Sequence, residues 1–216
     1  KYLKKYCKDS KTVLDIGCGP GQFMKVASNL GFKAYGVDAD QRYKAKNVVD
    51  LDAPVKDNIE KIAKALGKDV PEILVAVLDR PRHEKLIKEI RDTGARVRLF
   101  TDGDIAMAVA SSLPDNPVDV LMGIGGSTEA VLAAASLKCV GGQILARWKP
   151  YDFEKNVLSE KHVKRLNDAG VIDFKKIFSV DDLVRGNYVT FTATGVISGP
   201  MLEGVVFKAN KIITHS

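Results

Sequence analysis

The chain has 216 residues, of which 45% are hydrophobic and 28% charged, a composition that is ordinary for a globular protein with a buried core. No apolar run approaches the roughly 20 residues that cross a bilayer, and the first ten residues lack the apolar centre of a signal peptide. The sequence therefore argues against a membrane-spanning helix, and we expect a cytoplasmic protein of one large or two small α/β domains.

The net charge of +6 is concentrated near the N-terminus. Residues 1–50 contain ten Lys and Arg against five Asp and no Glu. A basic segment can contact nucleic acid, but four of these lysines recur at the spacing of one helix face: Lys1, Lys4, Lys5 and Lys8. We therefore expect a solvated helix face here and no nucleic-acid partner.

The first periodic unit spans residues 12–37. Thr12–Ile16 is apolar and β-prone, residues 17–21 form a glycine turn, Gln22–Leu30 has a helical pattern, and Ala34–Val37 is again β-prone. This order predicts a Rossmann-like strand, glycine turn, helix and strand, in a unit that we place at residues 1–48.

Glycines and acidic residues of this unit fit a nucleotide site. Gly17, Gly19 and Gly21 would let backbone amides approach a ligand. Asp38 ends the strand that would lie beside them, where it could accept hydrogen bonds from ribose hydroxyls. The G-x-G-x-G spacing after Asp15 resembles the first motif of S-adenosylmethionine-dependent methyltransferases, which implies that Asp15 and the three glycines face the methionine part of S-adenosylmethionine and Asp38 the ribose. The alternative, a turn that needs glycine for structural reasons alone, stays open.

Strands and helices alternate regularly after a break at Asp50–Pro54. The predicted elements are helix Asn58–Leu66, strand Ile73–Leu78, helix His83–Thr93, strand Val97–Phe100, helix Ile105–Leu113, strand Val118–Met122, helix Thr128–Lys138 and strand Gln143–Ala146. Such alternation is typical of parallel strands joined by crossover helices. We therefore predict for residues 49–216 an α/β fold of three layers, with a mostly parallel sheet and helices on both faces.

The pattern changes after Arg147. A polar stretch at 149–176 is followed by β-rich runs at Tyr188–Thr194, Val205–Lys208 and Ile212–His215. We expect these runs to add strands to an edge of the sheet near the C-terminus.

Three loops follow the carboxyl ends of predicted strands, where open parallel sheets bind ligands. The first, at 79–83, sets Arg80 and Arg82 ahead of a helix N-terminus, and each guanidinium can offer forked donors to a phosphate. A solvated basic turn is the alternative. His83, which follows, could add a donor near the phosphate, but we expect it to be a surface helix residue, and we assign no catalytic histidine.

The other two loops carry carboxylates and glycines. Asp102 and Asp104 flank Gly103, and such a pair can accept sugar hydroxyls or help to hold a cation, although Asp104 also stands where a helix N-cap belongs. The third loop is glycine-rich up to Gly126 and can cradle a phosphate, while Glu129 either offers an oxygen ligand to a metal or stabilises the helix start. Together the loops predict a site for a phosphorylated, hydroxylated ligand with a bridging metal.

Seven segments resemble class II fructose-1,6-bisphosphatases in their order and spacing. They are Val49–Pro54, Leu78–His83, Asp102–Asp104, Leu121–Gly126, Leu137–Gly142, Asp182–Gly186 and Ala193–Val196. The resemblance implies hydrolysis of the 1-phosphate of fructose 1,6-bisphosphate with Mg²⁺ or Mn²⁺. It further implies that the two arginines bind phosphate, the two aspartates bind the sugar, Gly126 binds substrate through its backbone, and Glu129 binds metal.

The chain also departs from that family. Gln143 stands where the family has Glu, and the turn before Glu129 reads Ser127-Thr128 in place of Ala-Pro. Residues 1–48 contain none of the acidic motifs that supply most metal ligands in the family. We therefore expect recognition of a phosphorylated sugar, with hydrolysis only if further metal ligands are supplied.

Two other functions stay open beside this one. The first is an S-adenosylmethionine-dependent methyltransferase, or a module that binds this cofactor, and the second is a non-catalytic fusion or chimera. No membrane partner is expected, and the sequence leaves a homo-oligomer open.

Overall fold

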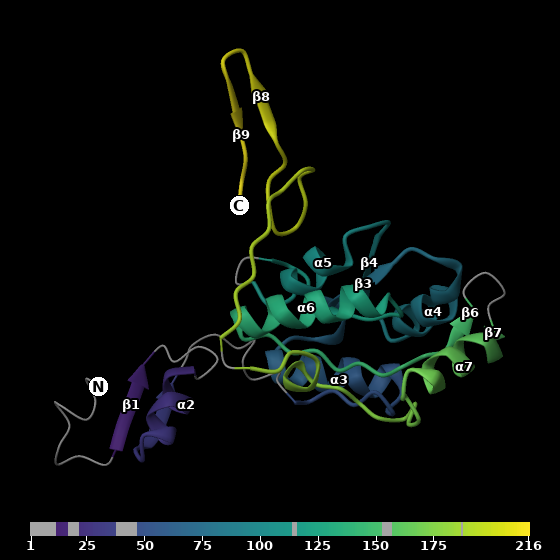
Figure 1. Ribbon diagram of the computed structural model, residues 1–216, viewed down its shortest axis with the longest axis horizontal. Helices are drawn as coiled ribbons and strands as arrows, with labels where there is room; N and C mark the ends of the chain where they lie inside the picture. Colours follow the sequence, from purple (N-terminus) through teal and green to yellow (C-terminus); the bar gives the residue numbers. More distant parts are fainter. Residues whose placement is uncertain (1–11, 17–21, 38–46, 114–115, 153–156, 187) are drawn as a thin grey trace.

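The computed structural model describes residues 12–16, 22–37, 47–113, 116–152, 157–186 and 188–216 (Figure 1). Its central sheet has three parallel strands: β3 (Leu74–Leu78), β4 (Arg96–Phe100) and β5 (Val120–Leu121). The strand order is β4-β3-β5, so β3 lies in the middle. Its sequence LVAVL is apolar throughout because both faces of a central parallel strand are covered.

Four helices cover this sheet: α3 (Val55–Leu66), α4 (Glu84–Asp92), α5 (Asp104–Ala110) and α6 (Ser127–Val140). Ile59 of α3 and Ile90 of α4 belong to one buried cluster with Val75 of β3. The next residue, Ala76, points to the opposite face and packs with Met107 of α5, against which α6 lies. The predicted α/β fold with a parallel sheet between helices is confirmed.

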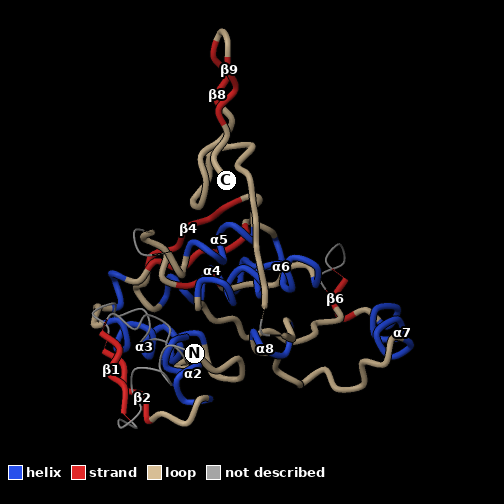
Figure 2. The backbone as a smooth tube through the Cα atoms, turned by 60° about the vertical axis from the view of Figure 1, so that its left-hand side comes forward, coloured by secondary structure: helices blue, strands red, loops and turns tan. Residues whose placement is uncertain are grey.

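The C-terminal β-rich runs form a sheet of their own. β8 (Val206–Lys208) and β9 (Lys211–Ile213) make an antiparallel hairpin that projects away from the helices in both views (Figures 1 and 2). A two-residue turn lets these runs pair with each other locally, so they do not extend the parallel sheet as the sequence suggested.

Two predicted strands do not form, although the structure describes both stretches. Residues 143–146 make one isolated bridge, Ala146↔Phe178, because their neighbour is a distant loop and not a strand of the sheet. Residues 188–194 run without a strand partner.

The polar stretch contains short elements. These are β6 (Tyr151–Asp152), β7 (Val157–Leu158), α7 (Glu160–Asp168) and α8 (Val180–Leu183), and single 3₁₀ turns precede α4 and β3 at η3 (Pro81–His83) and η2 (Val70–Glu72). Within the described residues, no helix has the length and apolar character that crossing a bilayer requires.

The N-terminal unit has the predicted strand–helix–strand order. β1 (Thr12–Ile16), α2 (Gln22–Asn29) and β2 (Lys33–Val37) follow one another, and the two strands are parallel in register up to Ile16↔Val37. Their carboxyl ends therefore lie side by side. The predicted basic helix at the start of the chain lies outside the described residues.

Asn47, near the end of the predicted unit at residues 1–48, is joined to Gln143, which lies just after α6. The backbone N–H of Asn47 donates to Oε1 of Gln143 at 2.8 Å, and Nε2 of Gln143 donates to Oδ1 of Asn47 at 3.0 Å. Asn47 has a φ of 61°, a left-handed conformation that Asn adopts more readily than most residues. At the position where the resemblance implies a Glu, the amide of Gln143 thus makes a structural contact.

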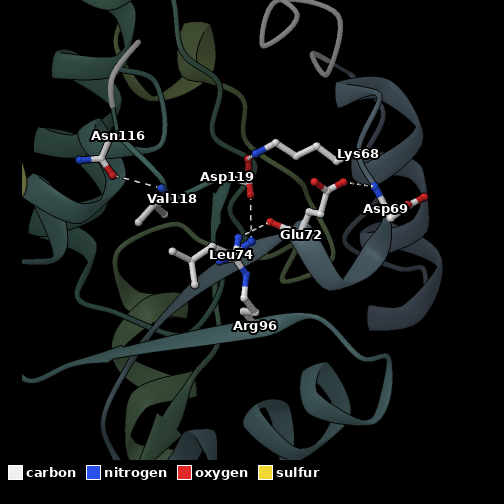
Figure 3. Close-up of polar contacts among 8 residues, drawn as sticks. All are labelled: Lys68, Asp69, Glu72, Leu74, Arg96, Asn116, Val118 and Asp119. Carbon is white, nitrogen blue, oxygen red and sulfur yellow. Dashed lines mark hydrogen bonds and ion pairs between the residues drawn. The ribbon is translucent and has the colours of Figure 1, made fainter.

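Asp119 ties the amino ends of β3 and β5 together (Figure 3). Its Oδ2 accepts the N–H of Leu74 at 2.8 Å, and its Oδ1 lies 2.6 Å from Nζ of Lys68. The carboxylate side chain is only 8% exposed, so the ion pair is partly shielded from water. This network lies at the end of the sheet opposite to the three predicted loops.

Candidate functional site

The three predicted loops converge at the carboxyl edge of the central sheet. They follow β3, β4 and β5, which are parallel neighbours and therefore end at the same edge. The amide of Asp79 donates to the carbonyl of Phe100 at 2.7 Å, which continues the ladder into the first loop. Hydrogen bonds between the loops then fix their relative positions.

Arg80 links the first loop to the second. Its Nη1 donates to its neighbour's carbonyl, Asp79 O, at 2.7 Å, and its Nη2 donates to Thr101 O at 2.8 Å. The side chain is exposed, and the two bonds leave further N–H groups of the guanidinium for a ligand.

Arg82 links the first loop to the third. Its Nε and Nη2 donate to the carbonyl of Ile124 at 3.0 Å and 2.9 Å. Burial lowers the pKa of Arg82 from its ordinary value, and the like charge of Arg80 adds to this, while Asp104 acts in the opposite direction. The two guanidinium groups are thus close enough to repel, and an anion between them would relieve that repulsion.

His83 is buried between the same two loops, and the expectation of a surface helix residue is wrong. The side chain is 1% exposed, because the 3₁₀ turn at Pro81–His83 directs it inward beneath Gly123. Its Nδ1 donates to Leu78 O at 2.7 Å, and its Nε2 accepts the N–H of Ile124 at 2.8 Å. Burial lowers the pKa of His83, with a further contribution from the charge of Arg82.

The second loop places two carboxylates beside the third. Gly103, with a φ of 89°, occupies the N-cap position of α5, and Asp104 is the first helical residue. Because no side-chain bond caps this helix, the structure does not support the capping interpretation of Asp104. A β-carbon at Gly125 would come within 3.1 Å of Asp104 Oδ2, so this carboxylate lies against the glycine loop. Asp102 is exposed beside it and accepts the N–H of Gly103 at 2.8 Å.

The third loop ends in Gly126, which caps the N-terminus of α6. The carboxylate of Glu129 folds back onto Gly126 so closely that a β-carbon there would clash with Oε2. Glu129 is exposed and lies in the first helical turn, where a negative charge stabilises the helix. The position therefore fits the helix-stabilising interpretation and also presents a carboxylate at the edge.

The described residues do not form a complete metal site. Among them, no group of three His, Cys, Asp or Glu side chains lies close enough to hold a metal ion. Glu129 is the predicted ligand, and the carboxylates of Asp102 and Asp104 belong to the neighbouring loop. These residues alone do not fit a bound divalent metal, which needs additional oxygen ligands.

The predicted nucleotide residues fall largely outside the described part. Gly17, Gly19, Gly21 and Asp38 are not described, and Asp15 is placed only as a backbone position in β1. The structure therefore positions the strands that would flank such a site, and not the site itself.

The described edge combines two guanidinium groups, three carboxylates and the exposed glycines of the third loop, Gly123, Gly125 and Gly126. Guanidinium groups bind phosphate, and carboxylates accept hydrogen bonds from hydroxyl groups. The structure brings the predicted loops to one edge of the sheet, and the functional roles of their residues stay predictions. The burial of His83 and the contacts to the main chain of Ile124 were not predicted from the sequence. The only local signal for His83 was its place directly after the two arginines in the same turn.

Comparison with known proteins shows which family the chain resembles. The family model described as "Bacterial fructose-1,6-bisphosphatase, glpX-encoded" matches residues 39–216. The chain is 38% identical over 177 residues to the fructose-1,6-bisphosphatase class 2 of Haemophilus influenzae, a match that covers 79% of the chain and 53% of the relative. It is 37% identical over 178 residues to the fructose-1,6-bisphosphatase 1 class 2 of Escherichia coli, covering 80% and 53%.

A third relative carries a broader name. It is the D-fructose 1,6-bisphosphatase class 2/sedoheptulose 1,7-bisphosphatase of Trichodesmium erythraeum, 37% identical over 177 residues that cover 80% of the chain and 51% of the relative. The chain thus spans about half the length of the curated relatives it matches. Because the match extends over most of this chain and includes all three loops, the chain belongs to the class II, glpX-encoded family of bacterial fructose-1,6-bisphosphatases.

Proposed function

We propose that this chain binds fructose 1,6-bisphosphate at the carboxyl edge of its central sheet and contributes this half of the site to hydrolysis of the sugar bisphosphate, which would yield fructose 6-phosphate and phosphate. The observation that carries the proposal is the placement of Arg80 and Arg82 in one turn at this edge, where Arg80 bonds to the second loop and Arg82 to the third. Burial lowers the pKa of Arg82, and the like charge of Arg80 lowers it further. Their mutual repulsion would be offset by a phosphate bound between them.

The neighbouring loops suit the sugar. Asp102 and Asp104 present carboxylate oxygens that accept hydrogen bonds from sugar hydroxyls. Gly126 has no side chain, so its backbone can approach the ligand at the start of α6, where the helix dipole favours an anion. In this arrangement the arginines hold a phosphate and the aspartates orient the sugar.

The proposal includes a divalent metal, Mg²⁺ or Mn²⁺, which Glu129 would help to bind. Proteins usually hold Mg²⁺ through one or two carboxylates together with substrate phosphates. Glu129 would be one such ligand, beside oxygens of the substrate phosphate, because the described residues contain no cluster of three His, Cys, Asp or Glu side chains that could hold the ion. We therefore assign binding to this chain and derive no step of hydrolysis from its described residues alone.

Thermal unfolding with and without fructose 1,6-bisphosphate and Mn²⁺ tests the binding step. A ligand at about a hundred times its dissociation constant stabilises the folded state by roughly 2.7 kcal/mol. We expect a clear rise in Tm, and a weaker one when Arg80 is replaced by Ala. No rise at millimolar ligand would sink the proposal. Phosphate release, assayed in parallel, should be slight for this chain alone.

A second candidate function concerns the N-terminal unit. β1 and β2 are parallel and end together at Ile16↔Val37, the arrangement that a nucleotide-binding glycine turn requires. We propose S-adenosylmethionine as its ligand only on this ground and on the spacing of the three glycines. Calorimetry with S-adenosylhomocysteine, with Asp38→Ala as the control, tests it, and absence of heat at high concentration would exclude it.

A further inference from the structure

We propose that His83 is a positioning residue that holds the glycine loop 123–126 against the arginine turn, and that it does so as a neutral imidazole protonated on Nδ1. The functional part of this inference rests on the proposed function, because the loop that His83 holds is the one that would bind a phosphate. The contacts of His83 themselves are observed without any ligand.

The two hydrogen bonds of His83 specify one tautomer. The carbonyl of Leu78 can only accept, so the proton lies on Nδ1, which is 2.7 Å away. The N–H of Ile124 can only donate, so Nε2 must keep its lone pair at a separation of 2.8 Å. A doubly protonated ring would set two N–H groups against each other and leave the partly buried amide of Ile124 without its acceptor.

Adjacent residues of the first loop hold one residue of the third. His83 accepts the N–H of Ile124, and Arg82 donates twice to the carbonyl of Ile124. Both main-chain groups of Ile124 are therefore fixed by side chains that lie 41 and 42 positions earlier in the sequence. Movement of the loop would break bonds on both sides of Ile124.

The ring also limits the space available to the loop. At Gly123, a β-carbon would lie 3.2 Å from Cε1 and Nε2 of His83, and φ is 152°. A residue with a side chain is disfavoured there by both the contact and the backbone conformation. Packing and hydrogen bonding thus act on the same loop.

Two charged groups act on His83 from the elements around it. Arg82, on its own turn, disfavours a charged imidazole, and Asp104, at the start of α5, favours it. Burial is the largest influence and lowers the pKa of His83. Acidification should therefore loosen the loop only below pH 6.5, the ordinary pKa of histidine.

Three variants separate the hydrogen bonds from the volume of the ring. His83→Gln retains one donor and one acceptor but does not titrate, His83→Phe fills similar space without these bonds, and His83→Ala removes both. Binding of inorganic phosphate and of fructose 1,6-bisphosphate with Mn²⁺ is measured by calorimetry between pH 5 and 8, and circular dichroism checks that each variant folds.

At each pH the Kd of the wild type is divided by the Kd of His83→Gln. Protonation of the ligand changes both Kd values equally, so it does not affect this ratio. We expect this ratio to be constant above neutrality and to rise about tenfold on acidification, in favour of the Gln variant. His83→Phe should bind the ligand roughly fivefold more weakly at neutral pH, because the loop loses the stabilisation of about one hydrogen bond. A folded His83→Phe with wild-type affinity at every pH would overturn the proposal.

Nitrogen-15 spectra of the full chain without ligand separate this proposal from the function on which it rests. We expect Nδ1 of His83 to carry the proton and the amide of Ile124 to exchange slowly with solvent in the wild type and rapidly in His83→Phe. A proton on Nε2, or rapid exchange in the wild type, would overturn the positioning role. Slow exchange together with no ligand binding would uphold it and overturn the proposed function.

Discussion

Arg82 closes over the third loop by donating from both Nε and Nη2 to the carbonyl oxygen of Ile124, at 3.0 Å and 2.9 Å. Such a two-pronged contact requires the planar fork of a guanidinium. The side chain proposed to bind phosphate therefore also fixes the loop that cradles it.

Replacing Arg82 by Lys should weaken binding of fructose 1,6-bisphosphate about tenfold, because an ammonium cannot reproduce the fork on Ile124 while also facing a phosphate. Calorimetry measures the change. Arg91→Lys, on the exposed end of α4, is the matched control and should leave the affinity unaltered. Equal affinities for both variants would contradict the assignment.

Gly123→Ala should destabilise the fold more than Gly94→Ala does. Both positions have a positive φ, but an added β-carbon meets the His83 ring at 3.2 Å in the first case and nothing within 4 Å in the second. The second variant thus reports backbone strain alone. We expect a difference of about 1 kcal/mol in the free energy of unfolding, measured with urea. The opposite order would show that the ring does not constrain the loop.

Asp119→Ala should lower stability and spare binding. The substitution removes the acceptor of the Leu74 N–H and the partner of Lys68, at the end of the sheet away from the loops (Figure 3). We expect a loss of roughly 1–3 kcal/mol in the free energy of unfolding, with ligand affinity unchanged at a temperature where the variant is folded. Asp119→Asn, which keeps an acceptor for Leu74, should lose less.

The wild type should become less stable as the pH falls below 6.5, with His83 as one cause. The folded state lowers the pKa of His83 from 6.5, so between the lowered value and 6.5 the unfolded chain binds more protons than the folded chain. The free energy of unfolding therefore falls through this window on acidification and recovers above it. Urea unfolding of the wild type and His83→Gln across this range measures the difference, which should grow as the pH falls.

Removal of residues 1–45 should leave a folded remainder, if the proposed division into units at 1–48 and 49–216 is correct. The central sheet takes its strands from residues 74–121, and the Asn47–Gln143 pair survives the cut. Circular dichroism and a Tm close to that of the full chain would support the division. An insoluble or molten remainder would favour the alternative that the N-terminal unit completes a structural layer.

Periodicity predicted most of the central fold. The alternation from residue 58 to 138 predicts the observed strands and helices, with shifts at their ends. A wholly apolar segment such as LVAVL in β3 can be recognised as a buried strand from its composition. The hairpin of β8 and β9 was predicted as strands but not as a separate sheet, because pairing partners depend on what lies nearby in space.

The site was predictable as a set of loops and not as a set of contacts. Strand ends in a parallel sheet bring Arg80, Asp104 and Gly126 to one edge whatever their side chains do. The burial of His83 depends on main-chain groups of Leu78 and Ile124, which no residue type reveals. The N-cap of α5 was likewise not predictable from residue type, because Gly103 occupies it through its backbone conformation and Asp104 is already helical.

Because the loop is held through the main chain of Ile124, the identity of that residue is largely unconstrained by the contact. Any amino acid with a backbone N–H could occupy position 124 and keep both attachments, whereas proline would lose the one to His83. The joint between the arginine turn and the glycine loop is therefore independent of the side chain that stands at position 124.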